Sequence, residues 1–78
     1  MEGIIGEIKL VTHNFQMKDY IYCDGRPLSI EQYTPLYALI GIKFGGNGTD
    51  TFCLPKLENP SQGMCYVICV NGIFPARD

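Results

Sequence analysis

Four cysteines are the side chains of this sequence best suited to covalent chemistry: Cys23, Cys53, Cys65 and Cys69. An even number of cysteines in a chain of 78 residues predicts disulfides if the protein leaves the reducing cytosol. Cys65 and Cys69 fall in one predicted strand, where residues four apart are separated by about 13 Å. A disulfide needs Cα atoms within about 7 Å, so these two cysteines cannot bond to each other.

Two interpretations of the cysteines remain open, and all four are disulfide candidates. In the first, Cys23 and Cys69 are small apolar residues of the core. In the second, Cys65 or Cys53, which lie beside predicted turns, cross-links neighbouring subunits of a durable assembly. A redox or metal-binding module is a third hypothesis, although the C-x3-C spacing of Cys65 and Cys69 is not that of a thioredoxin-type site.

The other polar residues do not form a catalytic set. His13 is the only histidine, and no His–Cys spacing of the zinc-finger type accompanies it. The carboxylates fall in predicted turns and at a helix start, without a candidate nucleophile beside them. The glycine-rich residues 45–48 are not followed by the Gly-Lys-Ser/Thr of a phosphate-binding loop. We therefore expect no enzyme, no metal, no cofactor and no small-molecule substrate.

Length and composition favour an assembly subunit. We predict a single domain over residues 1–78, whose core supplies only a few kcal/mol, so oligomerisation or cross-links are expected. Hydrophobic residues make up 46% of the chain and charged residues 18%, which favours burial of the surface against other subunits. The basic residues are scattered and the net charge is -2, so nucleic acid is not an expected partner.

The sequence predicts neither membrane insertion nor a classical signal peptide. No apolar run reaches the roughly 18 residues that a transmembrane helix needs. The first residues carry Glu2 and Glu7 where a signal peptide carries basic residues, and their apolar run is short.

Hydrophobic patterns predict several short strands. Residues 6–11 alternate polar and apolar side chains, which is the strand period, and we expect Ile8 and Leu10 to face the core. Residues 20–23 and 51–54 are further short strands. Residues 64–70 are apolar on both faces, which predicts the central strand of a sheet.

One short helix is predicted at about residues 30–40. Ser29 and Gln32 have capping-box spacing, and Gly41 is a natural residue to end the helix. Pro35 interrupts a helix that begins at Ser29, so the alternative start is Thr34 as N-cap with Pro35 at the first helical position. We expect one turn from Ser29 and then a short helix that ends near Ile40. The fold class is α+β, with short and mostly antiparallel strands.

The order of these segments resembles the phage tail-collar domain, as found in short tail fibres and in the microcystin-dependent proteins. The resemblance is concentrated in residues 25–55, and residues 66–75 are similar to the C-terminus of the microcystin-dependent proteins. The matching motifs are residues 6–8, 22–25, 28–30, 36–41, 44–48 and 51–55.

The chain departs from the family pattern after Pro55. It continues as Lys56-Leu57-Glu58-Asn59, where the family usually reads Asp-Leu-Arg-Gly-Arg. About ten residues, with a turn region at residues 58–63, join Pro55 to the final strand in place of the long insertion that can form a receptor-binding tip in tail fibres. The resemblance therefore implies a mounting domain without a binding head, and receptor recognition does not carry over.

These observations predict a non-enzymatic structural protein that self-assembles through strand and apolar contacts into an extracellular fibre, filament or appendage. The alternative is a small trimeric adaptor in a phage tail or contractile injection system. Either hypothesis has the chain itself as partner and a virion-associated or extracellular location. We expect the strand contacts between subunits in residues 4–11 and 64–74. The candidate interface residues are Ile4, Ile5, Ile8, Leu10, Tyr66, Ile68, Val70, Ile73 and Phe74.

Overall fold

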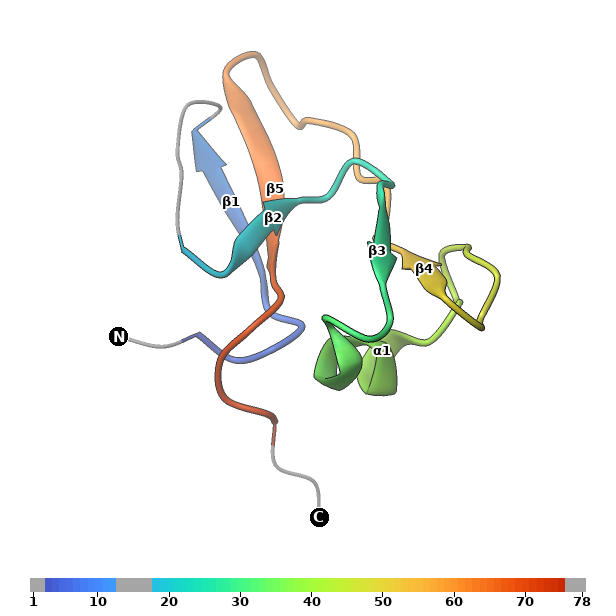
Figure 1. Cartoon of the computed structure of the whole chain (residues 1–78). Helices are drawn as coiled ribbons and strands as arrows, with labels where there is room; N and C mark the ends of the chain where they lie inside the picture. Colours follow the sequence, from blue (N-terminus) through green and yellow to red (C-terminus); the bar gives the residue numbers. More distant parts are fainter. Residues whose placement is uncertain (1–2, 13–17, 76–78) are drawn as a thin grey trace.

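Two small antiparallel sheets and one short helix make up the computed structural model, which describes residues 3–12 and 18–75 (Figure 1). The three-stranded sheet has the order β1 (Ile8–Thr12), β5 (Met64–Cys69), β2 (Tyr20–Tyr22). The two-stranded sheet pairs β3 (Pro27–Ser29) with β4 (Thr51–Cys53), and α1 (Thr34–Ile40) lies between these strands in the sequence. The predicted α+β fold with one short helix is confirmed. His13 lies outside the described residues.

Strand β5 is the centre of the larger sheet, as its sequence predicts. It pairs antiparallel with β1 on one side and with β2 on the other. Its side chains are buried on both faces: Ile68 packs in the core cluster, while Cys65 and Val67 are buried on the opposite face. A strand that has a neighbour on both edges and is covered on both faces has a continuous run of apolar residues in its sequence, and residues 64–70 have this pattern.

The prediction that Ile8 and Leu10 face into the core is wrong. Ile8 lies opposite Ile68, and Leu10 lies opposite Tyr66, so these four side chains share one face of the sheet. Ile68 and Tyr66 contact the core on that face, but Ile8 and Leu10 stay 44% and 48% exposed. The alternation identified the correct face, but the helix and the second sheet do not extend over β1 (Figure 1).

The helix begins later than its capping-box signal. Ser29 Oγ accepts a hydrogen bond from the Gln32 N–H at 3.4 Å, and a turn over residues 30–33 precedes α1. Tyr33 is the N-cap, without a side-chain hydrogen bond, so the alternative with Thr34 as N-cap is wrong. The Thr34 hydroxyl instead donates to the Ile30 carbonyl at 2.9 Å. The predicted turn from Ser29 and the helix ending at Ile40 with Gly41 as C-cap are confirmed.

The glycine-rich loop packs against β4. Asn47 Oδ1 accepts hydrogen bonds from the N–H groups of Thr49, Asp50 and Thr51 at 2.7, 2.8 and 3.1 Å. The backbone of Gly46 approaches Phe52 so closely that a Cβ there would overlap the Phe52 Cα. These contacts hold the loop on the strand that carries Phe52, which is fully buried.

The two ends of the described chain pair with each other. Ile4 and Ile73 form a parallel bridge, in which Ile5 N–H donates to the Ile73 carbonyl at 2.8 Å and Ile73 N–H donates to the Gly3 carbonyl at 2.9 Å. Ile5 is buried in the same core cluster as Leu36, Leu54 and Val70.

Candidate functional site

Exposed apolar side chains are the most prominent surface feature of the described residues. We name Ile8 and Leu10 the β1 row, because both project from the same face of β1. Ile4, Ile73 and Phe74 form the terminal cluster, in which Ile4 and Ile73 are bridged; their side chains are 48%, 53% and 48% exposed. Large aliphatic and aromatic groups at such exposure lose solvent contact favourably when another surface covers them.

The structure separates the predicted interface residues into two groups. Ile5, Ile68 and Val70 are buried in the core of a single chain, and Tyr66 packs against that core. The side chains of Ile5, Ile68 and Val70 are therefore covered by the chain itself, whereas Tyr66 is half-buried. The predicted interface residues on the surface are Ile4, Ile8, Leu10, Ile73 and Phe74.

Sequence reasoning missed a third exposed apolar group after the helix. Ile42 and Phe44 are 51% and 45% exposed, and we name them the loop pair. They follow Gly41, which ends α1, and they precede the glycine-rich loop. The sequence signal that could have identified them is the occurrence of two large apolar residues in a segment that has no predicted strand or helix to bury them.

Residues 4–11 and 64–74, which were predicted to form strand contacts between subunits, pair with each other within the chain. Strand β1 pairs with β5 along its whole length, and Cys69 N–H donates to the Glu7 carbonyl at 2.9 Å. Only one edge of β1 is used in this way, because β1 lies at the edge of the three-stranded sheet. The other edge has no strand beside it among the described residues.

All four cysteines are free thiols in the described chain. Cys23, Cys65 and Cys69 are buried, and Cys53 on β4 is half-buried. Burial, together with the nearby Asp24 carboxylate, raises the pKa of the Cys23 thiol to about 11, so this thiol stays protonated and is a poor nucleophile. Cys53 is the cysteine best placed to meet another subunit.

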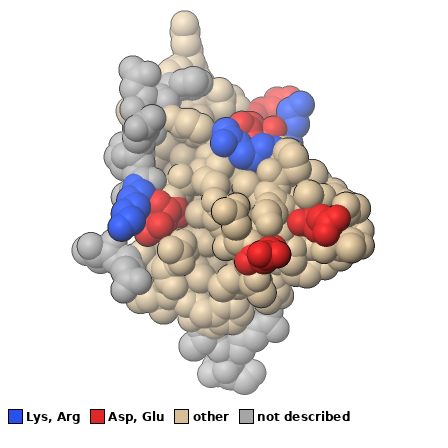
Figure 2. Space-filling model, in the orientation of Figure 1, with Lys and Arg blue, Asp and Glu red and all other residues tan. Residues whose placement is uncertain are grey.

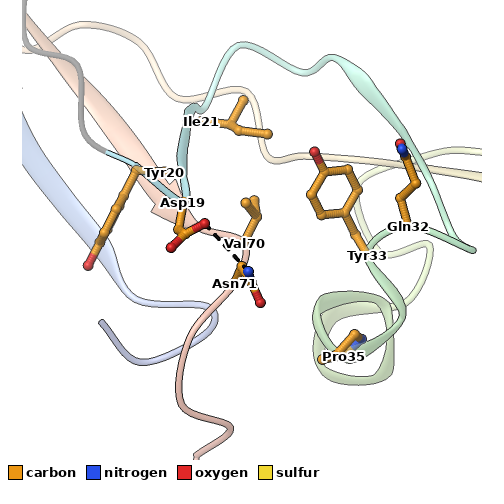
Figure 3. A pocket seen from close by; sticks show the side chains of 8 residues that line it. All are labelled: Asp19, Tyr20, Ile21, Gln32, Tyr33, Pro35, Val70 and Asn71. Atoms are coloured by element: carbon orange, nitrogen blue, oxygen red, sulfur yellow. Dashed lines mark hydrogen bonds between the residues drawn. The ribbon is translucent and has the colours of Figure 1, made fainter. Parts of the chain in front are cut away.

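A polar groove of about 350 Å³ lies between β2, the turn before α1 and the segment after β5 (Figure 3). Asn71 Nδ2 donates to Asp19 Oδ1 at 3.5 Å on one side, and the Tyr33 ring lies on the other. The residues that line the groove include no Cys, Ser, His or Lys. The groove therefore offers hydrogen bonds but no nucleophile with a base beside it. Its lining residues are Asp19, Tyr20, Ile21, Gln32, Tyr33, Pro35, Val70 and Asn71.

Comparison with known proteins decides the family. Residues 6–60 match the sequence model of the Phage Tail Collar Domain family. The chain belongs to this family. No curated protein matches the chain. The collar match contains β1 to β4 and α1, and it ends before β5. Membership indicates a structural role of the phage tail fibre type and a virion- or tail-associated location, and the collar family is not an enzyme family.

Charged side chains of the collar domain are few, and one pair of opposite sign, Arg26 and Asp24, is in direct contact. Arg26 Nη2 lies 2.8 Å from Asp24 Oδ2, and this contact lowers the pKa of the Asp24 carboxyl. Figure 2 shows a face that is mostly uncharged, with acidic and basic groups side by side in places and acidic groups without a basic neighbour elsewhere. Among the described residues, no three His, Cys, Asp or Glu side chains come together as a set of metal ligands.

The described residues of the collar domain form one helix, which has seven residues, and it is not long and apolar enough to cross a membrane.

Proposed function

We propose that this collar-domain chain is a non-enzymatic subunit that self-assembles into a fibre, filament or appendage outside the cell or on a virion. The uncovered β1 row is the observation that carries the proposal. Ile8 and Leu10 lie on the sheet face where Ile68 is buried and Tyr66 packs against the core of the chain. A second subunit would complete this covering at the one strand that lacks it.

The arrangement of apolar groups supports a polymer. The β1 row and the loop pair come from opposite sides of the molecule, as the positions of β1 and of the segment after α1 in Figure 1 indicate. A subunit with exposed apolar side chains on two separate surfaces can bind a neighbour on each side. The assembly then stays open unless the rotation between subunits closes a ring.

A disulfide between subunits is a second element of the proposal, and Cys53 is its candidate. It is the only cysteine of the four that is not buried. It lies on β4 with Gly45 against its side chain, close to the loop that follows the loop pair. Contact between loop pairs of neighbouring subunits would bring Cys53 near the interface.

The family match also favours a second candidate, a closed trimeric adaptor at a phage tail or injection-system baseplate. This candidate uses the same exposed apolar side chains but stops at a defined number of subunits. The two candidates therefore differ in whether the mass of the assembly is finite.

The experiment is negative-stain electron microscopy of the purified full chain, with and without reductant, together with sedimentation at micromolar concentration. Long fibres would support the polymer, and their loss in reductant would place a cysteine between subunits. Small uniform particles in both conditions would support the adaptor. A strictly monomeric protein under oxidising conditions would refute both candidates.

A further inference from the structure

We propose that two copies of this chain pair through the open edges of their β1 strands, antiparallel, with Leu10 opposite Leu10 of the second copy. This inference deepens the proposed function and rests on its premise that the chain self-associates. It names the strand, the register and the symmetry of one contact.

The hydrogen-bond pattern of β1 determines which main-chain groups are available. Along an antiparallel pair, alternate residues direct their N–H and C=O groups toward the partner strand. Glu7 bonds to Cys69 on β5, so Lys9 and Val11 are the next residues of β1 that bond inward. The main-chain groups of Ile8, Leu10 and Thr12 then point to the open edge.

The outward-directed residues of β1, which are Ile8, Leu10 and Thr12, are arranged symmetrically about Leu10. In an antiparallel pair centred there, Leu10 bonds to its own copy, and Ile8 of each strand bonds to Thr12 of the other. All outward groups of the strand find partners in this register, because the outward positions lie at equal spacing on either side of Leu10. A shift by two residues leaves outward groups of Ile8 or Thr12 unpaired within the strand.

Charge selects the same register. Lys9 is the only charged residue in β1, and its ammonium lies 5.3 Å from the centre of the Tyr20 ring within the chain. With Leu10 at the centre, Lys9 lies opposite Val11 of the second copy. Moving the centre to Lys9 would place the two ammonium groups directly opposite each other, which destabilises a strand pair.

Side-chain contacts explain why the occupant is a second copy. The pairing joins two sheets with the order β2-β5-β1 into one six-stranded sheet, with its two-fold axis perpendicular to the sheet at Leu10. Both β1 rows then lie on the same face, side by side, and the helical layers of both copies flank them on that face. Apolar side chains meet apolar side chains, and Ile8 meets the methyl group of Thr12.

Engineered cysteines in the full chain test the register, with Cys53→Ser as background. Leu10→Cys is expected to form a disulfide-linked dimer under mild oxidation, because opposite Cα atoms in such a pair are about 5.5 Å apart, within disulfide range. Ile8→Cys is the matched control, since it changes another exposed aliphatic residue of the β1 row. Its two thiols would lie about 13 Å apart and should not cross-link. Equal cross-linking of both variants, cross-linking of Ile8→Cys alone, or none in either would overturn the proposed register.

A charge substitution separates failure of this inference from failure of the proposed function. Leu10→Lys puts two ammonium groups at the two-fold axis and should weaken dimerisation at least about tenfold in sedimentation equilibrium. Leu57→Lys, which removes an exposed apolar side chain outside the β1 row, the terminal cluster and the loop pair, should leave this step unchanged. If the wild-type chain self-associates and Leu10→Lys does so equally well, the β1 contact is wrong and the proposed function stands. If the wild-type chain stays monomeric, both are wrong.

Discussion

Leu10 on β1 lies directly opposite Tyr66 on β5, yet only Tyr66 packs against the core. The two side chains share one face of the sheet, and the layer formed by the helix and the second sheet ends between them. Leu10 keeps 48% of its surface exposed for this reason. A boundary of this kind, within one sheet face, is expected where a protein meets its partner.

Truncation of two aliphatic side chains on this face should have very different effects. Ile68→Ala removes a side chain that is 2% exposed and should lower the free energy of unfolding by about 2–5 kcal/mol. Leu10→Ala should lower it by less than about 1 kcal/mol in dilute, monomeric protein. Urea denaturation followed by circular dichroism measures both changes. Similar losses in the two variants would mean that Leu10 is buried in the single chain.

Gly46 should tolerate no side chain. Its φ is +105°, and a Cβ there would overlap the Phe52 Cα and lie 2.6 Å from the Thr51 carbonyl oxygen. Gly46→Ala should therefore destabilise the fold by more than about 3 kcal/mol, since both conformational strain and a backbone clash oppose it.

Gly63→Ala is the matched control for this substitution. Gly63 also has a positive φ, +83°, but nothing lies within 4 Å of its Cβ position. Its loss of stability should be about 1–2 kcal/mol, from strain alone. Thermal unfolding of both variants gives the comparison, and equal shifts in Tm would show that the close approach of the loop to β4 is wrong.

The elements with strong local signals were predictable from the sequence. Residues 64–70 are apolar on both faces because β5 has neighbours on both edges and cover on both faces. The helix ends where Gly41 permits a positive φ. The predicted hydrogen bond between Ser29 Oγ and the Gln32 N–H also forms. The helix itself begins only at Thr34, because proline is tolerated in the first turn of a helix and Pro35 must lie there.

Features that depend on the tertiary arrangement were not predictable in this way. Strand β3 has only three residues, and it exists because β4 pairs with it. Alternation in β1 showed that Ile8 and Leu10 share a face but carried no information about whether a second layer reaches them. The exposed loop pair was missed because its exposure depends on where the glycine loop folds back. The burial of Cys65 likewise depends on packing that its neighbouring turn does not reveal.

Cys53 should be the first thiol to react in the folded chain. It is half-buried, whereas the other three cysteines are buried. A disulfide-exchange reagent should modify one thiol quickly under native conditions and the remaining three only as the chain unfolds. Cys53→Ser should remove the fast phase, and Cys65→Ser, a matched change at a buried site, should retain it. A fast phase that persists in Cys53→Ser would show that one of the buried thiols is accessible.

Tyr20 should make the fold sensitive to alkaline pH. Burial is the main cause that raises its pKa from 10.0 to about 12, and the hydrogen bond from its hydroxyl to Glu7 Oε1, at 3.0 Å, adds to the effect. The folded chain then keeps a proton that the unfolded chain releases. The contribution of Tyr20 to stability is therefore fully present below pH 10 and is lost as the pH rises through about 12.

The comparison of wild type with Tyr20→Phe isolates this effect. The Cys23 thiol also has a raised pKa, from 9.0 to about 11, so alkaline pH lowers the stability of wild type and variant through this group as well. Because Cys23 is present in both proteins, its contribution cancels in the difference between them. Urea unfolding of both proteins should give a wild-type stability that falls more steeply above pH 10 than that of the variant. Parallel curves would mean that the Tyr20 hydroxyl ionises equally easily in the folded and unfolded chains.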